Sequence, residues 1–433
     1  MVILGLGTNQ GNRLYNLRRT FEQLKKIPDF SIKKISPIYI SDALLPQNAP
    51  DSWNKPYFNL CISAETALSP DALLTYTKRI EKIIGRQEEK DWGPRIIDID
   101  ILAWDQKIIM HDRLHIPHEH LHERPFALKP LSDIVPFWRH PIQKKTAIEM
   151  VKQWGENLPL HTKQIPHRID IPELVGIVNI TPDSFSDGGT FTDDLPLQLV
   201  KAGAEVIDFG AEATGPKAIS LNSDQEWARL SPVLEKFIRE KNDLLTTPKI
   251  SIDTYHPETA KKALAFNVDW INDVSGLDNV AMREVVAEHS CDVVFMHHLG
   301  IPVSKSSLIP LHEDPVQHVF EWAEKRIALL EKSGIAKERL IFDVGIGYGK
   351  TAEQSLALIQ DISVFKKLGC RLLVGHSRKS FLTLFTNKPA HERDLETGVI
   401  SLYLANQGVD YLRVHHIKNH MRFFYLSSQM AIP

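Results

Sequence analysis

The C-terminal part of the chain repeats one pattern, in which a short apolar run ends in a polar side chain and is followed by a helix-like stretch. The apolar runs read LVGIVN, AEVIDFG, KISID, VDWIND, DVVFMH, RLIFDVG, RLLVGHS and DYLRVHH, and only the last lacks a following helix-like stretch. Runs this apolar are typical of parallel strands that are buried on both faces. Eight such runs in roughly 260 residues predict a (β/α)₈ barrel over residues 173–433.

Nearly every one of these predicted strands ends in a polar or ionisable group. These groups are Asn179, Asp208, Asp253, Asn272 with Asp273, His297, Asp343, Ser377 with Lys379, and Arg413 with His415. The strand ends of a (β/α)₈ barrel meet at one rim, where the chemistry takes place. Any one of these side chains could simply cap the following helix, but so many on one rim indicate a site.

Residues 1–156 follow a different order, which predicts a separate domain. The patterns predict strands over residues 2–7 and 57–66 and helices over 16–25 and 70–84. A polar, proline-punctuated stretch over residues 157–172 reads as a linker. The chain of 433 residues is also longer than a domain that folds around one ordinary hydrophobic core. We therefore expect two domains.

Two carboxylates interrupt an otherwise aliphatic strand in GPRIIDIDILAW, residues 93–104. Asp98 and Asp100 are two positions apart, so on a strand they point to the same face. Unpaired acids in an apolar interior cost several kcal/mol, and two like charges repel. A hard cation with oxygen ligands removes both difficulties, and Mg²⁺ with a nucleotide phosphate is the usual case.

Several cations surround this acidic pair in the sequence, namely Arg86, Arg95, Arg113, His118 and Arg124. An acidic pair that binds a metal, together with several nearby cations, is typical of sites that catalyse phosphoryl transfer. The alternative is that Asp98 or Asp100 forms a plain structural ion pair with an arginine. Spacing alone leaves both interpretations open.

Charge and cysteine usage limit the partners and the compartment. A net charge of −3 offers no bulk attraction to nucleic acid or to an anionic membrane, so we expect neither as a partner. Three widely spaced cysteines, Cys61, Cys291 and Cys370, imply no disulfide framework and fit a reducing cytoplasm. We expect no signal peptide, and no apolar stretch approaches the ~20 residues that span a bilayer.

Three motifs resemble known sites without matching them. GIGYGKT at 345–351 resembles a phosphate-binding loop, but Val344 stands where the first glycine belongs. GLGTNQG at 5–11 resembles a dinucleotide motif, but its third glycine is one place late and no acid follows at the ribose position. His118, His120 and His122 alternate as zinc ligands could, but flanking prolines favour a loop with one working histidine.

The first domain resembles 6-hydroxymethyl-7,8-dihydropterin pyrophosphokinase in GLGTNQGN, PYFN, WGPRIIDIDIL and RLHIPHEHLHERPFAL. The resemblance implies an α/β/α sandwich with a ferredoxin-like core, in which Asp98 and Asp100 bind Mg²⁺ and act in catalysis with Arg86 and Arg95. It implies ATP contacts from Arg86, Trp92, Arg95, Arg113, His118 and Arg124. It implies a pterin held by Asn59 between Tyr57 and Phe126, and transfer of the ATP diphosphate to the pterin hydroxymethyl oxygen.

The second domain resembles dihydropteroate synthase, a (β/α)₈ barrel, in GIVNITPDSFSDGG, SIDT, FDVGIGYGK, LLVGHSRKS and RVHHIK. The resemblance implies pterin contacts from Asp253, Asn272, Met296, Asp343 and Lys379. It implies diphosphate binding by Asn179, Arg413 and His415, with Mg²⁺ on Asn179 and catalysis by Lys379, Arg413 and His415. It implies a p-aminobenzoate pocket formed by Thr214, Tyr348 and Ser380.

Two loops depart from these families. The loop between Gly85 and Trp92 is usually rich in arginine, but here it reads RQEEKD. The second synthase loop reads EATGPKA at 212–218, with Gly215 where the family has arginine and Lys217 as a substitute for the charge. We expect weaker p-aminobenzoate binding or a different loop closure, without loss of activity.

Together the two resemblances imply a bifunctional enzyme of folate biosynthesis. Its first domain makes the dihydropterin diphosphate from ATP, and its second condenses that product with p-aminobenzoate. Barrels of this kind usually dimerise, so a homodimer through the barrel is expected. The alternatives are a pterin-binding methyltransferase barrel, which the Arg413 and Asn179 motifs disfavour, and the decay of one domain into a scaffold.

Overall fold

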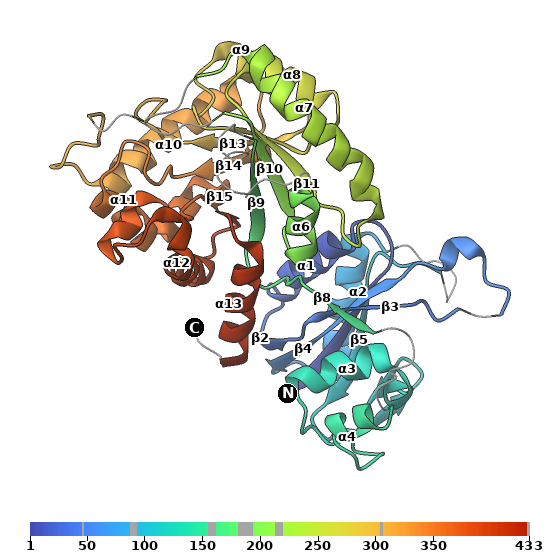
Figure 1. The fold of residues 1–433 in the computed structure, drawn as a ribbon. Coiled ribbons are helices and arrows are strands. Elements are labelled where there is room, and N and C mark those ends of the chain that lie inside the picture. The colour runs from blue at the N-terminus through green and yellow to red at the C-terminus, as the bar shows by residue number, and fades with distance from the viewer. Residues whose placement is uncertain are drawn as a thin grey trace. The chain divides into compact units, whose positions relative to one another are not determined.

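The computed structural model divides the chain into two units, Met1–Asp170 and Ile171–Pro433 (Figure 1). It describes residues 1–45, 47–86, 93–154, 162–180, 194–212, 220–303 and 306–430. The boundary falls inside the stretch that we expected to link the domains. Strand β8 (Lys163–Ile165) lies in that stretch, but it pairs with β3 (Ile38–Ser41) and so belongs to the sheet of the first unit. Among the described residues, no helix is long and apolar enough to cross a membrane.

The first unit is built on an antiparallel sheet with the strand order β5-β1-β4-β3-β8, and β2 also pairs with β4. The remaining strands are β1 (Val2–Thr8), β2 (Phe30–Ile35), β4 (Tyr57–Thr66) and β5 (Asp98–Trp104). β1 lies between β4 and β5, with Gly7 opposite both Asn59 and Asp98. This register brings residues from three strands to the same edge of the unit.

Helices cover both faces of this sheet. α1 (Arg13–Leu24) and α2 (Pro70–Ile84) contact each other, while α3 (Pro125–Ile134) and α4 (Ala147–Lys152) form a second pair. Helix α3 packs on β4 and β3. The order β1, α1, β3, β4, α2, β5 is that of a ferredoxin-like core, so the expected sandwich is confirmed.

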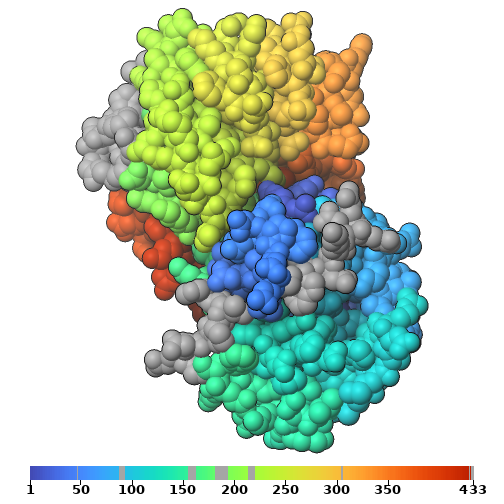
Figure 2. Space-filling model, turned by 90° about the vertical axis from the view of Figure 1, so that its right-hand side faces the viewer, coloured from blue at the N-terminus to red at the C-terminus, as the bar shows by residue number. Residues whose placement is uncertain are grey.

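Local sequence explains where these elements begin and end. Ser69 caps α2 by accepting a hydrogen bond from the amide of Ala72, and Pro70 starts the helix at a position where its missing N–H has no cost. The helix ends at Gly85, whose φ of 113° glycine adopts without strain. Strand β5 is the next element in the sequence, and a short hairpin of β6 (Ile109–His111) and β7 (Leu114–Ile116) follows it. The largely exposed segment between β3 and β4 lies on the surface of this unit (Figure 2).

The second unit is a closed barrel of parallel strands in the order β9 to β16, as the repeated pattern predicted. The strands are β9 (Glu173–Asn179), β10 (Val206–Gly210), β11 (Lys249–Asp253), β12 (Trp270–Asp273), β13 (Asp292–Met296), β14 (Leu340–Asp343), β15 (Arg371–Val374) and β16 (Tyr411–Val414). The helices are α6 (Leu195–Ala202), α7 (Ser223–Glu240), α8 (Pro257–Leu264), α9 (Val280–Ala287), α10 (Pro315–Lys332), α11 (Ala352–Gln360), α12 (Asp394–Asn406) and α13 (Ile417–Met430). A shared core of buried side chains, such as Phe209, Phe295 and Phe342, joins the helices to the strands.

The strand register determines which side chains meet at the rim of the barrel. Gly210 is opposite both Asn179 and Asp253, Asp253 is opposite Asn272, and Met296 is opposite Asp343. Closure of the barrel brings β16 next to β9. The polar strand ends that were predicted to meet are therefore neighbours in the structure.

Candidate active sites

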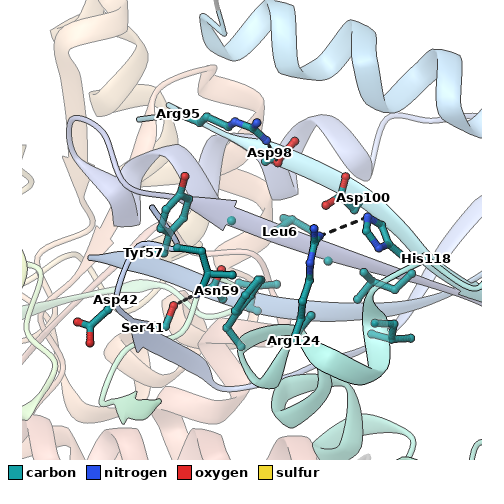
Figure 3. Close-up of a pocket in the computed structure, with 18 residues that line it drawn as sticks. Leu6, Ser41, Asp42, Tyr57, Asn59, Arg95, Asp98, Asp100, His118 and Arg124 are labelled. Carbon is teal, nitrogen blue, oxygen red and sulfur yellow. Dashed lines mark hydrogen bonds and ion pairs between the residues drawn. The ribbon is translucent and has the colours of Figure 1, made fainter. Parts of the chain in front are cut away.

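A cavity of about 440 Å³ opens on the first unit beside β1, β4 and β5 (Figure 3). Eight of the residues that we predicted for the kinase site line it: Tyr57, Asn59, Arg95, Asp98, Asp100, His118, Arg124 and Phe126. They come from two strands, from the segment before β5, and from the loop and helix that follow β7. The structure thus brings together groups that are up to 69 positions apart, from Tyr57 to Phe126.

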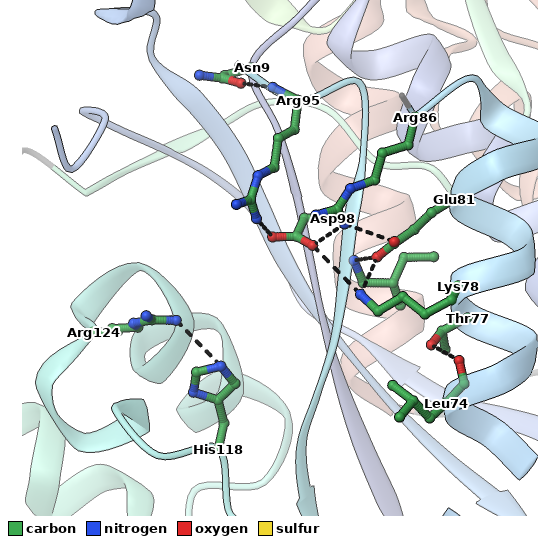
Figure 4. Close-up of polar contacts among 11 residues, drawn as sticks. Asn9, Leu74, Thr77, Lys78, Glu81, Arg86, Arg95, Asp98, His118 and Arg124 are labelled. Atoms are coloured by element: carbon green, nitrogen blue, oxygen red, sulfur yellow. Dashed lines mark hydrogen bonds and ion pairs between the residues drawn. The ribbon is translucent and has the colours of Figure 1, made fainter. Parts of the chain in front are cut away.

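The two acids of β5 face this cavity but differ in their partners. Arg86 and Arg95 each form a close ion pair with Asp98 (Figure 4). Burial raises the pKa of the Asp98 carboxyl, but Arg95 and Arg86 outweigh burial and lower it overall. Among the described residues, none forms a hydrogen bond or ion pair with the Asp100 carboxylate. Its pKa is raised by burial and by the neighbouring charge of Asp98.

The two acids therefore differ in their surroundings. Asp98 forms ion pairs with two arginines, while the Asp100 carboxylate lies at the cavity with no hydrogen-bond or ion-pair partner among the described residues. Asn9 fixes the backbone from which Arg95 projects, because its side chain accepts from the Arg95 amide at 2.7 Å and its own amide donates to the Arg95 carbonyl at 3.0 Å.

Glu81 and Lys78 of α2 support this cluster, although neither was among the residues predicted for the site. Glu81 is only 3% exposed. Its carboxylate accepts a hydrogen bond from the amide of Ile99 at 2.8 Å and forms ion pairs with Lys78 and Arg86, each at 2.8 Å. It therefore joins α2 to β5 beside Asp98. The helical i, i+3 spacing of Lys78 and Glu81 is the signal that could have identified the pair.

His118 and Arg124 lie on the opposite side of the cavity from Arg95. The His118 Nε2 atom lies 3.5 Å from Arg124 Nη1, and the His118 amide donates to the carbonyl of Leu102 at 2.9 Å. Burial and the nearby Arg124 charge lower the pKa of His118 to about 4. At neutral pH its imidazole is therefore a neutral acceptor or donor rather than a cation.

Asn59, Tyr57 and Phe126 form the remaining polar and aromatic wall. The side-chain amide of Asn59 donates to the Ser41 hydroxyl at 2.9 Å. Gly7 faces it, and a Cβ at Gly7 would lie 3.2 Å from the Asn59 side-chain oxygen. Glycine at this point of β1 thus leaves the Asn59 amide open to the cavity.

The GLGTNQG motif lies at the end of β1, which pairs with both of its neighbours in antiparallel fashion. This pairing excludes a dinucleotide-binding βαβ unit for the motif.

One predicted kinase residue that the structure describes is not part of this cluster. Arg113 lies in the exposed turn between β6 and β7 and is not among the residues that line the cavity. Trp92 and the altered loop at 87–91 lie outside the described residues. Of the three alternating histidines, only His118 lines the cavity, since His120 pairs with Glu123 and His122 packs against His140.

The rim of the barrel carries a second polar cluster, which centres on Asp208. This residue is 1% exposed. Its carboxylate accepts hydrogen bonds from Arg413 Nε at 2.6 Å, Ser251 Oγ at 2.6 Å and Asn272 Nδ2 at 3.2 Å. Arg413 also pairs with Asp253 at 2.8 Å. Asp208 was recognised in the sequence as a strand end but not as a site residue, although it joins two predicted site residues.

Burial perturbs the acids and bases of this rim. Burial raises the pKa of Asp253 even though Arg413 opposes the change. Burial likewise raises the pKa of Asp343, against the effect of Lys379. Burial lowers the pKa of Lys379 to about 8, and the Asp343 carboxylate limits that change. Groups that titrate near neutrality or hold a buried charge are typical of functional sites.

Lys379 contacts the loop after β14 and lies near Asp343. Its ammonium donates to the carbonyl of Ile346 at 2.7 Å and lies 4.7 Å from the centre of the Tyr348 ring. A Cβ at Gly375 would lie 3.5 Å from the Asp343 carboxylate and 3.9 Å from the Lys379 ammonium, so the two groups border the same small space. Met296, at the end of β13, is buried beside Asp343 in the strand register.

The described residues that we predicted to bind the diphosphate and p-aminobenzoate differ in how far they are exposed. His415 Nδ1 lies 2.9 Å from the Ser377 hydroxyl, and burial, with Arg378 and Arg413, lowers the His415 pKa to about 3. Asn179 ends β9 with its side chain exposed, and Ser380 is exposed at the start of a short 3₁₀ helix, Ser380–Leu384. Thr214, Gly215 and Lys217 lie outside the described residues.

Comparison with known proteins gives the same division of the chain. Residues 3–136 match the family of 7,8-dihydro-6-hydroxymethylpterin-pyrophosphokinases, and residues 175–415 match the family of pterin binding enzymes. The folate synthesis bifunctional protein of Chlamydia muridarum is 36% identical over 100% of this chain and 98% of its own length. That of Arabidopsis thaliana is 32% identical over 97% of this chain and 94% of its own length.

Solved structures resemble the barrel unit. Dihydropteroate synthase from Anaplasma phagocytophilum with bound 6-hydroxymethylpterin-monophosphate is 35% identical, with a TM-score of 0.55 over 60% of this chain and 100% of that one. The Xanthomonas albilineans enzyme with 4-aminobenzoic acid is 32% identical, with a TM-score of 0.54 over 61% of this chain and 95% of that one. The chain therefore belongs to the bifunctional folate synthesis proteins, with a hydroxymethyl-dihydropterin diphosphokinase as its first unit and a dihydropteroate synthase as its second.

Proposed function

We propose that Asp98 and Asp100 bind Mg²⁺ together with the phosphates of ATP in the first cavity. The observation that carries this proposal is the Asp100 carboxylate, which faces the cavity next to a second acid and has no cationic partner among the described residues. Two oxygen donors on one face of a strand suit a hard cation. When bound, the metal would offset the negative charge of the phosphates.

The cations of this site would hold the rest of the triphosphate. Arg86 and Arg95 already meet at Asp98, and Arg124 and His118 lie across the cavity, so phosphate oxygens between them would meet donors from both sides. Arg113 would have to approach from its exposed turn. Donors that are held in place before the reaction lower its barrier without reorganisation, which is how positioning catalyses phosphoryl transfer.

The pterin would lie on Asn59, with Tyr57 and Phe126 at its ring faces. All three line the cavity, and Gly7 leaves the Asn59 amide accessible. The hydroxymethyl oxygen attacks the β-phosphorus of ATP and loses its proton to solvent, the bond from that phosphorus to the α-phosphate oxygen breaks, and AMP leaves. The residues of this chain would orient the two substrates for that displacement.

Nucleotide binding tests the metal site directly. We expect a non-hydrolysable ATP analogue to bind the intact chain much more tightly with Mg²⁺ than without it, and Asp100→Asn to remove most of that difference. Asp105→Asn is the matched control, because Asp105 is an exposed acid of the same unit that pairs only with the N-terminal amine among the described residues. An unchanged Mg²⁺ dependence in Asp100→Asn would reject the site.

For the barrel we propose that Asp253, Asn272, Met296, Asp343 and Lys379 bind the pterin and that Asn179, Arg413 and His415 bind the diphosphate. The neighbouring strand ends and the Arg413 guanidinium, held by two carboxylates, support this assignment. Mg²⁺ on Asn179 would share the diphosphate charge. Thr214, Tyr348 and Ser380 would border p-aminobenzoate, which the related Xanthomonas structure contains.

The condensation follows from this arrangement of charges. The bond from the pterin methylene to the diphosphate oxygen breaks, the p-aminobenzoate amine forms the new C–N bond, and the amine loses one proton. Arg413 would stabilise the departing diphosphate, while His415, neutral near pH 7, would donate a hydrogen bond to it. We expect Lys379→Met to raise the KM for the dihydropterin diphosphate severalfold, while the exposed-site control Lys325→Met changes nothing. Equal kinetics in the two variants would contradict the assignment.

We also propose that the chain forms a homodimer through the outer face of α12 and α13. The two helices contact each other, and Leu395, Val399 and Leu426 on them are each more than half exposed. Adjacent exposed apolar side chains of this kind mark interaction surfaces. Light scattering should give twice the mass of one chain, and Val399→Lys should give the mass of a single chain. A monomer in the unmodified protein would refute this proposal.

The free thiols Cys61, Cys291 and Cys370 accord with the reducing cytoplasm that we propose.

A further inference from the structure

Lys350 is a buried cation that lies outside the residues assigned to either substrate. It ends the GIGYGK segment, which connects β14 to α11 and also carries Tyr348. We propose that Lys350 is a positioning residue whose ammonium holds the carbonyls of Gly345 and Tyr348 and thereby keeps Tyr348 at the p-aminobenzoate side of the synthase site. This inference rests on the proposal that Tyr348 borders that substrate.

The contacts of Lys350 account for all three of its N–H bonds. The side chain is 6% exposed, and its Nζ lies 2.8 Å from His297 Nδ1 and 2.9 Å from each of the Gly345 and Tyr348 carbonyl oxygens. The carbonyl of His297 is a fourth, more distant neighbour at 3.4 Å. Three close acceptors match the three donors of an ammonium, whereas a neutral amine would offer only two.

The protonation states of the neighbours agree with this arrangement. Burial and the Lys350 charge hold the pKa of His297 far below its usual value, so its imidazole is neutral and Nδ1 can accept. Burial and the charge of Lys379 hold the pKa of Lys350 well below its usual value, and the Asp343 carboxylate opposes that change. The three close acceptors around Nζ are therefore the observation that indicates an ammonium here. With all of its donors used by the chain, Lys350 has none left for a phosphate, so this segment does not act as a phosphate-binding loop.

Close packing fixes one side of the segment against the end of β13. Gly345 has a φ of +68°, and a Cβ there would lie 1.9 Å from the His297 carbonyl oxygen. A Cβ at Gly349 would lie 2.5 Å from Leu299, while the Gly349 carbonyl accepts from the Ile309 amide at 3.0 Å. Only glycine fits these two positions, so the backbone follows a single path past His297.

The other side of the segment faces Lys379. The Ile346 carbonyl accepts from the Lys379 ammonium at 2.7 Å, and the same ammonium lies 4.7 Å from the centre of the Tyr348 ring. The carbonyls of Gly345 and Tyr348 therefore point to Lys350, while the carbonyl of Ile346 points to Lys379. Without Lys350, the Tyr348 carbonyl would lose a donor in a region largely closed to water, and the backbone would move to recover one.

Substitution by methionine tests this role, because Lys350→Met keeps the unbranched side chain and removes the donors. We expect the KM for p-aminobenzoate to rise about tenfold and the KM for the dihydropterin diphosphate to change by less than about threefold. AMP formation by the first unit serves as a control within the same polypeptide and should be unchanged. Lys325→Met, at an exposed position of α10, controls for the loss of one lysine.

A double-mutant cycle separates positioning from general stability. If Lys350 acts through Tyr348, Lys350→Met adds little to the p-aminobenzoate KM once Tyr348→Ala is present. Additive effects, or an equal rise of both KM values, would overturn the inference. If Lys350→Met does not fold, His297→Leu removes one acceptor and should shift the p-aminobenzoate KM alone; an unchanged KM would again overturn it. An unchanged KM in Tyr348→Ala would instead reject the proposed p-aminobenzoate site.

Discussion

Replacement of Asp208 by asparagine removes one charge from the rim of the barrel while keeping the shape of the side chain. The asparagine oxygen can still accept from Arg413 and Asn272, and its amide can donate to the Ser251 hydroxyl. The change therefore leaves the hydrogen bonds in place and isolates the contribution of the Asp208 charge to the position of Arg413.

The contacts set the expected magnitude. Removing one partner of a buried ion pair costs about 3–5 kcal/mol. Here Arg413 keeps its second partner, Asp253, at 2.8 Å. A charged hydrogen bond contributes about 1.5–3 kcal/mol against about 1 kcal/mol for a neutral one, so we expect the free energy of unfolding of the barrel to fall by about 0.5–2 kcal/mol. A loosened Arg413 should lower the synthase kcat/KM about tenfold, because 1.4 kcal/mol corresponds to a factor of ten.

Urea unfolding and steady-state kinetics with supplied dihydropterin diphosphate measure the two effects. Asp292→Asn is the matched control, since Asp292 pairs with Arg371 at 2.8 Å where β13 begins, at the end of the barrel away from the rim. That variant should lose stability but keep its kcat/KM. The reasoning would be refuted if Asp208→Asn kept both values, or if Asp292→Asn lowered kcat/KM as much as Asp208→Asn.

The structure makes two further predictions and the sequence a third. The pKa of Lys379 is lowered to about 8, so its ammonium is lost as the pH rises through that value. The synthase kcat/KM should fall above about pH 8, and Lys379→Arg should move this decline to higher pH; the same decline in both proteins would exclude Lys379 as its source. Glu81→Gln should destabilise the first unit by about 2 kcal/mol and lower the rate of AMP formation, because it weakens the contacts to Lys78 and Arg86. The exposed acid Glu65, paired with Lys33 at 3.0 Å, should tolerate the same change within about 0.5 kcal/mol, and equal effects at both sites would contradict the supporting role of Glu81. Gly215→Arg should lower the KM for p-aminobenzoate, and an unchanged KM would show that the altered loop does not limit binding.

Local patterns predicted the barrel because each strand carries its own signal. A run such as KISID is apolar, ends in a carboxylate and precedes a helix, and β11 begins and ends where that run does. The acidic pair of β5 was predictable for the same reason, since alternation along one strand places Asp98 and Asp100 on one face. The resemblance to known families then supplied the chemistry that spacing left open.

What the sequence did not reveal depends on contacts between distant segments. β8 is three residues long and becomes a strand only by pairing with β3, more than 120 positions earlier. Asp208 gained its role when barrel closure placed Arg413 beside it, 205 positions away. Lys350 looked like part of a phosphate-binding motif, and only the fold shows its ammonium turned inward. Arg113 was assigned to the ATP site, but the structure leaves it on an exposed turn.

The central claim is that one chain carries two sites that work independently, and assays of the two half-reactions on Asp98→Asn test it most directly. AMP formation from ATP and hydroxymethyl-dihydropterin is measured first, and dihydropteroate formation from supplied dihydropterin diphosphate and p-aminobenzoate second. We predict that Asp98→Asn abolishes AMP formation and leaves the second rate unchanged. Loss of both rates in a folded variant, or retention of AMP formation, would contradict the claim.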